Sequence, residues 1–503
     1  MGGRLRPKVW SMSRSPPRRL SGQACGTLSQ VRQASLQTEE TVLFHSLPFV
    51  GVFLPLTYLV YWRLRGRAHR YQWLAVAGCV FYAVLDYKFC ALLVASMLLT
   101  YAAGVGLSIW QDPLRRRLCA AVPLAGGLFL LGFFKFAMVW LDTANSVANK
   151  FQLAIEVPHL SLMVPLGLSW YVAGMLIYII ETYTGRIQPT RNFWEFACQI
   201  TFFPKLIAGP IARFWQTDAD LKNLGQAEGN SSVRLGLSFF ALGMIQKVLI
   251  ADTLAGLIDP GLKHYGQLST AGAWMCMLGY TYQFYFDCAG YFDMAVGLGH
   301  LFGIRLPQNF NSPYQAVDLR DFWRRWNITI SAVLRDFIYF PLGGSRGSRS
   351  QTCRNLFITM LLCGIGHGPN WAFVAWGGYH GVLLAANYLG ARQWDRLPRF
   401  LRQLGTFFLI VIGWVFFRSD DLPMAFALLR TMFSAHAGPT LPHTPSLLLI
   451  LVTSAVIAHG LPNAGLLSHR WRLLPGLAIA GLFALCLVMI YGSQPSSYLI
   501  CSF

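Results

Sequence analysis

The chain has 503 residues, of which 54% are hydrophobic and only 12% are charged, and its mean hydropathy is +0.44. Because soluble domains carry about 25% charged residues, this composition excludes an ordinary soluble protein and predicts a polytopic membrane protein. The net charge of +20 could indicate a nucleic-acid-binding protein, but the arginines gather in short loops between apolar segments. That distribution is the positive-inside pattern of membrane proteins, so we expect contact with membrane lipid and no nucleic acid.

Residues 1–40 differ from the rest of the chain. They are rich in arginine and serine, have no acidic residue before Glu39 and lack an apolar run. A secretory signal requires such a run, so we expect these residues to be a basic, disordered tail or the result of a start codon assigned too early. Residues 41–503 are expected to form a single membrane domain, since no fixed-period repeat and no second soluble domain is visible.

Apolar runs long enough to cross a hydrocarbon core of ~30 Å recur from residue 43 to the C-terminus, so roughly ten to twelve membrane segments are expected. The fold class is therefore all-α. The segments at 72–86 and 89–110 are expected to meet in an outer turn at Asp86–Lys88, because basic loops lie at their other ends. The expected segments are 47–62, 72–86, 89–110, 119–141, 160–182, 196–212, 234–258, 272–302, 357–390 (long enough for two short helices), 404–417, 446–461 and 474–492.

The stretch ITFFPKLIAGPIARF, residues 200–214, interrupts its apolar run with Pro204, Gly209 and Pro210 and also carries Lys205. Irregular backbone at membrane depth is tolerated only where protein or a water-filled cavity solvates it. We therefore expect a broken or re-entrant segment here.

Polar side chains also interrupt residues 280–303, YTYQFYFDCAGYFDMAVGLGHLFG. Asp287 and Asp293 are six residues apart and lie on different faces of a helix, which argues against two carboxylates that share a proton. Ionisable residues at membrane depth pair with one another or line functional pathways. Structural pairing and the lining of a water-filled cavity are both open for these aspartates.

If residues 318–344, DLRDFWRRWNITISAVLRDFIYFPLGG, form one helix at about 100° per residue, their polar and apolar side chains fall on opposite sides. Aromatic and aliphatic residues then fill one side. The pattern predicts an amphipathic interfacial helix whose arginines meet lipid phosphates or an anionic ligand, although a cytoplasmic surface helix has the same period. The polar side carries Asp321, Arg324, Arg325, Asn327, Ser331, Arg335 and Asp336.

Residues 361–381, LLCGIGHGPNWAFVAWGGYHG, place His367 and His380 in an apolar run. On one ideal helix these histidines would lie about 220° apart, but GHGPNW predicts a helix break because Pro369 lacks an N–H. A hydrogen-bonded structural histidine is one interpretation of His367. The other is a general base, since a neutral imidazole can take a proton from a hydroxyl near neutral pH.

The cysteines and glycines give no sign of a bound metal or nucleotide. The eleven cysteines are scattered and include no Cys-x-x-Cys pair, which predicts neither a zinc site nor a disulfide framework. No glycine-rich phosphate loop is present, which argues against an ATP-driven pump. We expect no metal and no tightly bound cofactor.

Together these stretches resemble the membrane-bound O-acyltransferase family, in the bacterial branch typified by the membrane subunit of alginate O-acetylation. Several separated motifs that occur in one order are more specific than any one of them. The matching motifs are PLGLSWYVAGMLIYIIETYTG (165–185), FFPKLIAGPIARF (202–214), YQFYFDCAGYFDMAVGLGHLFGIRLPQNFNSPY (282–314), DFWRRWNITISAVLRDFIYFPLGG (321–344), GIGHGPNWAFVAWGGYHG (364–381) and the terminal YLICSF.

The resemblance implies a ring of helices around a central tunnel in the cell inner membrane. It implies that His367 assists the attack of an acceptor hydroxyl on an acyl thioester, acetyl-CoA or another, delivered from the cytoplasm. The acyl group, expected to be acetyl, would pass toward an exported polysaccharide through a periplasmic partner. Binding of the donor or substrate is expected of Arg324, Arg325, Arg335, Asp336, His380 and Asp287.

Two positions depart from the family pattern: Asn327 replaces the histidine of WRRWH, and Gly366 replaces the tryptophan before the key histidine. Asparagine can donate and accept hydrogen bonds but cannot titrate near pH 7. Asn327 is expected to be a catalytic position. If it only orients the substrate or His367, activity is expected to survive; if the position relays protons, activity is expected to be weak or altered. The alternatives are a family member that has lost catalysis and acts as a scaffold, and a proton-coupled transporter that uses the intramembrane aspartates and His367.

Overall fold

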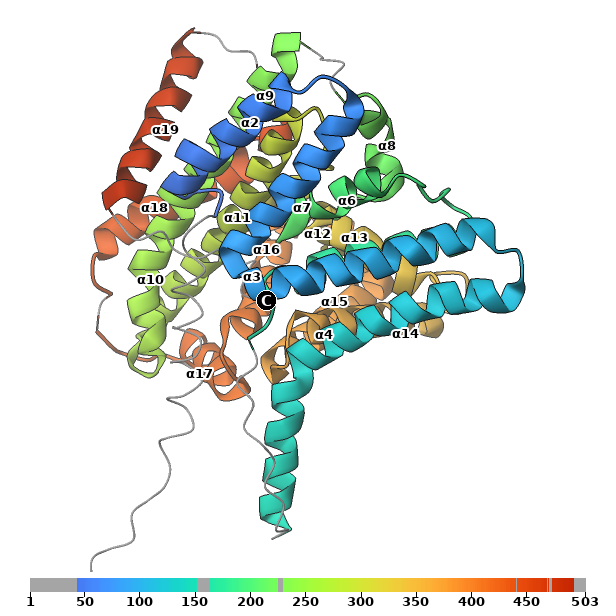
Figure 1. Cartoon of the computed structure of the whole chain (residues 1–503). Coiled ribbons are helices and arrows are strands. Elements are labelled where there is room, and N and C mark those ends of the chain that lie inside the picture. The colour runs from blue at the N-terminus through green and yellow to red at the C-terminus, as the bar shows by residue number, and fades with distance from the viewer. Residues whose placement is uncertain are drawn as a thin grey trace, which may run out of the picture. The chain divides into compact units, whose positions relative to one another are not determined.

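The computed structural model describes residues 43–151, 163–224, 229–439, 441–467, 469 and 473–492. The predicted tail, residues 1–40, and the terminal motif YLICSF lie outside these ranges. Every regular element within them is a helix, and none is a strand, which confirms the all-α class (Figure 1). Short 3₁₀ turns occur at Tyr265–Gln267, Pro313–Gln315 and Ala464–Leu466.

Five of the described helices are long and apolar enough to cross a membrane, which confirms a polytopic membrane protein. This number is smaller than the ten to twelve expected segments, because several expected segments are short, broken or interrupted by polar side chains. The five lie in α3 (Arg67–Ile109), α4 (Pro113–Lys150), the run of α9 (Gly229–Met244), η2 (Ile245–Asp252) and α10 (Thr253–Lys263), α16 (Arg399–Arg418) and α19 (Leu473–Gly492). Shorter apolar helices are η1 (Phe49–Phe53) with α2 (Leu54–Arg63), α17 (Leu422–Met432) and α18 (Thr444–Gly460).

The turn expected at Asp86–Lys88 is a kink within α3. Asp86 has non-helical angles, φ −153° and ψ 99°, and its Oδ1 accepts a hydrogen bond from the Lys88 N–H at 3.0 Å. The two expected segments are thus the two halves of one kinked element (Figure 1).

The break expected at residues 200–214 is confirmed. The chain forms α6 (Phe193–Thr201) and the single turn α7 (Phe203–Leu206), and it becomes helical again only at α8 (Phe214–Lys222). Gly167, which precedes α5 (Leu168–Tyr183), has a φ of 70°, and a Cβ there would lie 2.8 Å from Ile207 Cα. The irregular segment therefore packs directly against the start of α5, so that protein solvates it.

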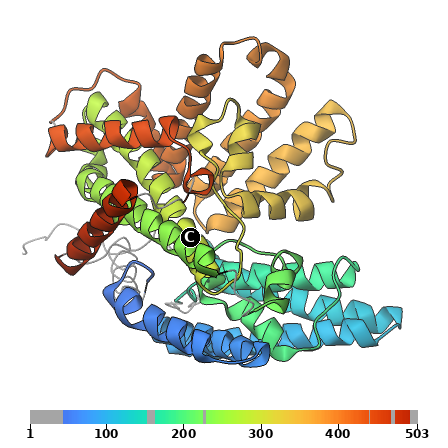
Figure 2. The same ribbon diagram turned by 90° about the horizontal axis from the view of Figure 1, so that it is seen from above.

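Helix α11 (Thr270–Leu301) is buried along almost its whole length, and glycines bring α9 and η2 close to it. A Cβ on Gly243 would lie 2.5 Å from the Gly290 carbonyl oxygen, and one on Gly297 would lie 2.6 Å from the Gly236 carbonyl oxygen. Small residues at such crossings let membrane helices pack tightly. Figure 2 shows this pair (green) near the middle, with α3 (blue) on one side and the α14–α15 hairpin (light orange) on the other.

The residues expected to form one amphipathic helix form α12 (Leu319–Arg325), α13 (Ile328–Leu334) and the π-helical turn η5 (Arg335–Tyr339). They lead into a hairpin of α14 (Arg349–His367) and α15 (Trp371–Trp394). A Cβ on Gly377 would lie 2.5 Å from the Met360 carbonyl oxygen, and one on Gly381 would lie 2.9 Å from Phe357 Cα. The glycines of this stretch therefore allow the two helices to touch.

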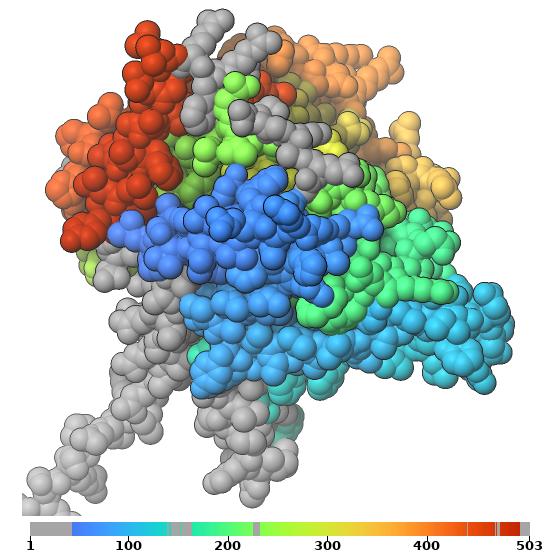
Figure 3. All heavy atoms as spheres, turned by 45° about the horizontal axis from the view of Figure 1, so that its top comes forward, coloured from blue at the N-terminus to red at the C-terminus, as the bar shows by residue number. Residues whose placement is uncertain are grey.

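Helix α19 lies on the outer surface, where Figure 3 shows it in red. Its large apolar side chains are exposed, with 78% of Leu474 and 66% of Val488 accessible. Exposed apolar side chains on a helix of this length fit contact with lipid.

Candidate active site

His367 is the last residue of α14, where the helix stops before Pro369. The next helix begins with Asn370 as its N-cap, whose Oδ1 accepts a hydrogen bond from the Ala372 N–H at 2.9 Å. Asn370 Nδ2 also donates to the Asp420 carbonyl oxygen at 2.7 Å. The predicted helix break is confirmed, and the Asn370 bonds tie it to the loop after α16.

One hydrogen bond sets the tautomer of His367. Its Nδ1 lies 2.7 Å from the Cys363 carbonyl oxygen; because a carbonyl can only accept, Nδ1 carries the proton in the neutral ring. Nε2 is then the nitrogen that can accept a proton. The half-buried ring lies against Trp376 and Phe417, each with its centroid 5.2 Å away. These contacts hold the imidazole in one orientation, as general base catalysis requires.

His380 contacts the same tryptophan and is completely buried. Its ring centroid is 5.1 Å from that of Trp376 and 5.1 Å from that of Trp323. A Cβ on Gly413 would lie 2.6 Å from His380 Nε2, so α16 can approach only with glycine at this position. The structure thus brings His367 and His380 to one tryptophan, which their spacing on a single helix would not do.

We call His367, His380, Trp323, Trp376 and Trp414 the histidine–tryptophan cluster. Within the described ranges, the indole N–H groups of Trp323 and Trp376 and both ring nitrogens of His380 are buried and make no hydrogen bond. Buried polar groups are otherwise almost always partnered. The cluster therefore combines an apolar wall with donors and an acceptor that polar groups of a substrate could satisfy.

Asn327 stands at the break between α12 and α13. Its φ of 43° and ψ of 59° are left-handed, a region that asparagine enters more readily than most residues. Its Oδ1 accepts a hydrogen bond from Asn309 Nδ2 at 3.2 Å. The single amphipathic helix predicted for residues 318–344 is therefore wrong. The preceding residue, Trp326, has its ring centroid 4.9 Å from that of Trp414, which links this break to the histidine–tryptophan cluster.

Asn327→His is expected to keep the fold, because histidine is also enriched in the left-handed region. If Asn327 orients a substrate or stands in for a proton relay, transfer should equal or exceed the wild-type rate. Asn327→Gly, which suits the backbone but has no side chain, is the matched control and should be slower. The measurement is acyl transfer by purified protein; a large loss in Asn327→His would show instead that the site is built around asparagine.

The arginines of the predicted polar face differ in their surroundings. Arg325 Nε donates to Asp321 Oδ1 at 2.8 Å and is held within α12. Arg324 and Arg335 are exposed. Their contact with a donor, like the roles of the other expected site residues, stays a prediction.

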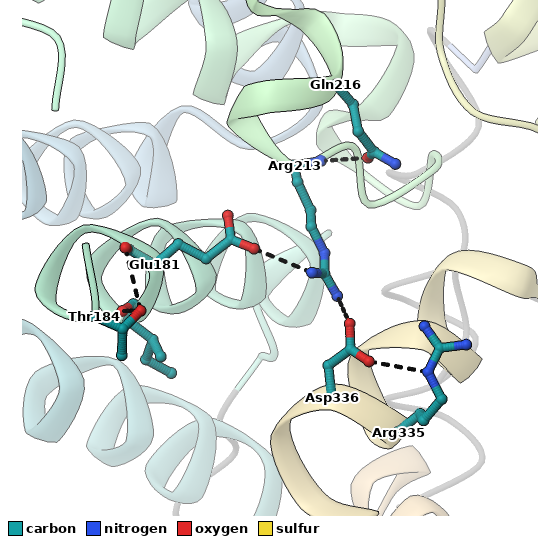
Figure 4. Close-up of polar contacts among 7 residues, drawn as sticks. Glu181, Thr184, Arg213, Gln216, Arg335 and Asp336 are labelled. Carbon is teal, nitrogen blue, oxygen red and sulfur yellow. Dashed lines mark hydrogen bonds and ion pairs between the residues drawn. The ribbon is translucent and has the colours of Figure 1, made fainter. Parts of the chain in front are cut away.

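Asp336 belongs to an ion-pair network that the sequence analysis missed (Figure 4). Arg213, before α8, binds Glu181 of α5 at 3.1 Å and Asp336 of η5 at 2.5 Å. Arg335 Nε binds the other Asp336 oxygen at 2.9 Å. Burial alone would raise the pKa of the Asp336 carboxyl, but the hydrogen bonds and charges of Arg335 and Arg213 outweigh burial and lower it. The network joins three segments that are distant in sequence.

Arg213→Met is expected to reduce the free energy of unfolding by about 2 kcal/mol, since hydrogen bonds to charged groups are worth ~1.5–3 kcal/mol. A carboxyl whose pKa is lowered by folding stabilises the protein above its unfolded pKa, and this contribution is lost as the pH falls through its folded pKa. The difference from wild type should therefore shrink in acid. Thermal unfolding in detergent at neutral and acid pH measures it. Arg396 is exposed, so the control variant Arg396→Met should be as stable as wild type. Equal losses of stability in the two variants would contradict a stabilising role for the network.

Asp287 is inside the protein. Lys247 Nζ lies 2.6 Å from Asp287 Oδ1 and 2.9 Å from Asp252 Oδ1. The neighbouring residue, Gln246, donates from Nε2 to Asp293 Oδ2 at 2.8 Å. Both intramembrane aspartates thus have polar partners on η2, and the predicted contact of Asp287 with a substrate stays a prediction.

Lys135 is a second feature near the site that sequence reasoning passed over. Its Nζ donates to the carbonyl oxygen of Gly366 at 2.8 Å. The available signal was that Lys135 is the one charged residue in the apolar run 119–141. For Arg213 and Glu181 the signal was weaker, since each lies near the end of a recognised motif without any pattern that pairs them. In the described ranges, no group of three His, Cys, Asp or Glu side chains could hold a metal ion.

Comparison with known proteins adds to this geometry. Residues 168–419 match the model of MBOAT, the membrane-bound O-acyltransferase family. The chain is 38% identical over 400 residues to the probable alginate O-acetylase AlgI of Pseudomonas aeruginosa, covering 78% of this chain and 75% of that protein. It is 34% identical over 435 residues to the peptidoglycan O-acetyltransferase of Helicobacter pylori, covering 80% and 81%. It is 29% identical over 242 residues to the teichoic acid D-alanyltransferase of Streptococcus thermophilus, covering 45% and 57%.

Proposed function

The chain belongs to the membrane-bound O-acyltransferase family, and from this we propose that it moves an acetyl group from a cytoplasmic thioester toward an exported polysaccharide. Two relatives are named as an alginate O-acetylase and a peptidoglycan O-acetyltransferase. Those names support acetyl as the transferred group and a polysaccharide as the class of acceptor. We place the enzyme in the cell inner membrane, with acetyl-CoA or another acyl thioester as donor and a periplasmic partner that completes the transfer.

The observation that carries this proposal is the state of His367. Its Nδ1 is committed to the Cys363 carbonyl, so Nε2 is the proton acceptor, and the break beside it ends the helix. Trp376 and Phe417 fix the ring. A neutral, oriented imidazole next to irregular backbone is the arrangement that a general base needs.

In the proposed reaction, the acceptor oxygen bonds to the acyl carbonyl carbon while His367 Nε2 takes the hydroxyl proton. The C–S bond then breaks, and the departing thiolate takes that proton from the imidazolium. The products are the O-acyl ester and the thiol. Because a thioester is already activated, positioning can supply ~7–11 kcal/mol of the barrier, and base assistance accounts for a further factor of about 10²–10⁴.

For the donor, we propose that the exposed Arg324 and Arg335 meet the phosphates of coenzyme A or of a carrier's pantetheine arm, since charge-assisted hydrogen bonds from guanidinium groups suit phosphate. Arg325 and Asp336 are engaged by Asp321 and Arg213 and would hold the neighbouring segments. His380 would line the site within the histidine–tryptophan cluster.

The transporter alternative rests on intramembrane aspartates with a proton-coupling role. Lys247 and Gln246 partner Asp287 and Asp293, which gives both aspartates a structural explanation. Nothing comparable accounts for the oriented His367 in a transporter, so acyl transfer is the better supported function.

The test is transfer of radiolabel from acetyl-CoA to a polysaccharide, or to the periplasmic partner, by purified protein in liposomes. We expect label in the acceptor and release of thiol in equal amounts. Uptake of a solute into the liposomes without either product would favour a transporter and refute the proposal.

A further inference from the structure

Lys135 lies in α4, inside the apolar span Pro113–Ala137. Ionisable residues within membrane helices are rare, usually face a protein interior or a cavity, and serve a function. An apolar residue would be cheaper at this position. The ammonium group therefore needs a functional explanation.

Lys135 is hydrogen-bonded to the backbone next to the candidate active site. Its Nζ donates at 2.8 Å to the carbonyl oxygen of Gly366, the residue immediately before His367. An ammonium group has three N–H donors, and this bond uses one of them. The Gly366 carbonyl thus fixes a cation beside the proton-accepting histidine.

Space for a ligand adjoins the same bond. Apart from its two chain neighbours and the backbone of its own helix turn, a Cβ built on Gly366 would meet no atom of the described chain within 4 Å, and Gly366 is exposed. Lys135 itself is only half-buried, so a ligand can reach its ammonium group. A cation, a base and room for a reacting group therefore lie next to one another.

We propose that Lys135 is a further catalytic residue, whose ammonium group binds the acyl carbonyl oxygen and stabilises its charge during transfer. This inference rests on the proposed acyl transfer. As the acceptor oxygen bonds to the carbonyl carbon and its proton passes to His367, the carbonyl π electrons move onto the oxygen beside Lys135. They return when the C–S bond breaks, and the thiolate takes the proton from His367. A positioned cationic donor beside the oxygen where charge develops stabilises such an oxyanion.

Lys135→Met removes the charge and the donors but keeps a side chain of similar length. Loss of one oxyanion donor lowers kcat about 10²–10³-fold in other enzymes, and we expect a loss of this size with a much smaller change in KM for acetyl-CoA. Lys135→Arg, which keeps a charged donor, should retain more activity than Lys135→Met. Both variants should bind an unreactive ketone analogue of acetyl-CoA, with CH₂ in place of sulfur, nearly as well as wild type.

Lys88→Met is the matched control, because Lys88 is exposed on α3, and it should leave kcat unchanged. If Lys135→Met has the wild-type kcat while His367→Ala is inactive in the same assay, the role of Lys135 is overturned and the proposed acyl transfer is not. Parallel losses of kcat, analogue binding and thermal stability in the Met and Arg variants would show a purely structural role and would also overturn it. Absence of transfer by the wild-type enzyme with every thioester tested would overturn the proposed function, and this inference with it.

Discussion

His367→Ala is expected to lower the rate of acyl transfer about 10²–10⁴-fold, the usual contribution of a general base. The loss should appear in kcat, because His367 acts on the proton of the reacting hydroxyl. KM for the thioester should change little, since the exposed arginines proposed to meet its phosphates lie on other segments. Steady-state transfer from radiolabelled acetyl-CoA, with purified protein in liposomes, measures both constants.

The control for this variant is His264→Ala. His264 is exposed at the end of α10, so its loss should leave kcat unchanged. Thermal unfolding of both variants shows whether each is folded, because His367 also bonds to Cys363 and contacts Trp376. Wild-type kcat in a folded His367→Ala enzyme would refute the catalytic role of His367.

Lys247→Met is expected to have the largest effect on stability, a loss of about 3–5 kcal/mol, because breaking a buried ion pair leaves an uncompensated charge. Lys247 and Asp287 are 1% and 2% exposed, and their atoms are 2.6 Å apart. Asp252, at 22% exposure, loses the same partner but can reach water. Thermal or denaturant unfolding of the detergent-purified protein is the measurement.

A second substitution separates loss of the pair from loss of packing. Replacing a whole buried ion pair by uncharged residues is often neutral, so Lys247→Met with Asp287→Asn should be more stable than Lys247→Met alone. Lys263 is an exposed lysine at the end of the same apolar span, Ser232–Lys263. The Lys263→Met variant should therefore be as stable as wild type. A double variant as unstable as the sum of its single variants would show that the two residues do not act as a pair.

Several features of the fold could be predicted because they depend on local covalent chemistry. Pro204 and Pro369 lack an N–H, and both predicted breaks are present where these prolines interrupt apolar runs. The all-α class followed from composition, since a membrane-spanning chain must satisfy its backbone hydrogen bonds internally. The motifs predicted the family, which the comparisons confirm.

Other features could not be predicted from helical periodicity. Residues 318–344 have the period of one helix, but Asn327 is left-handed. Buried Asn309 stabilises this break, because its carbonyl accepts a hydrogen bond from the Ile328 N–H at 2.9 Å and its Oδ1 accepts one from the Thr329 N–H at 3.2 Å. A residue about twenty positions away therefore overrides the local pattern.

The sequence by itself determined the class of protein, the helix breaks and the position of His367 in a recognised motif, because hydropathy, missing N–H groups and residue order are properties of the chain. Only the tertiary structure decided which polar groups meet. It places His367 and His380 against Trp376, Lys135 beside Gly366, and Arg213 between Glu181 and Asp336. Hydrogen bonds and ion pairs act over about 3 Å, so a pair formed between distant segments leaves no spacing in the sequence from which it could be inferred.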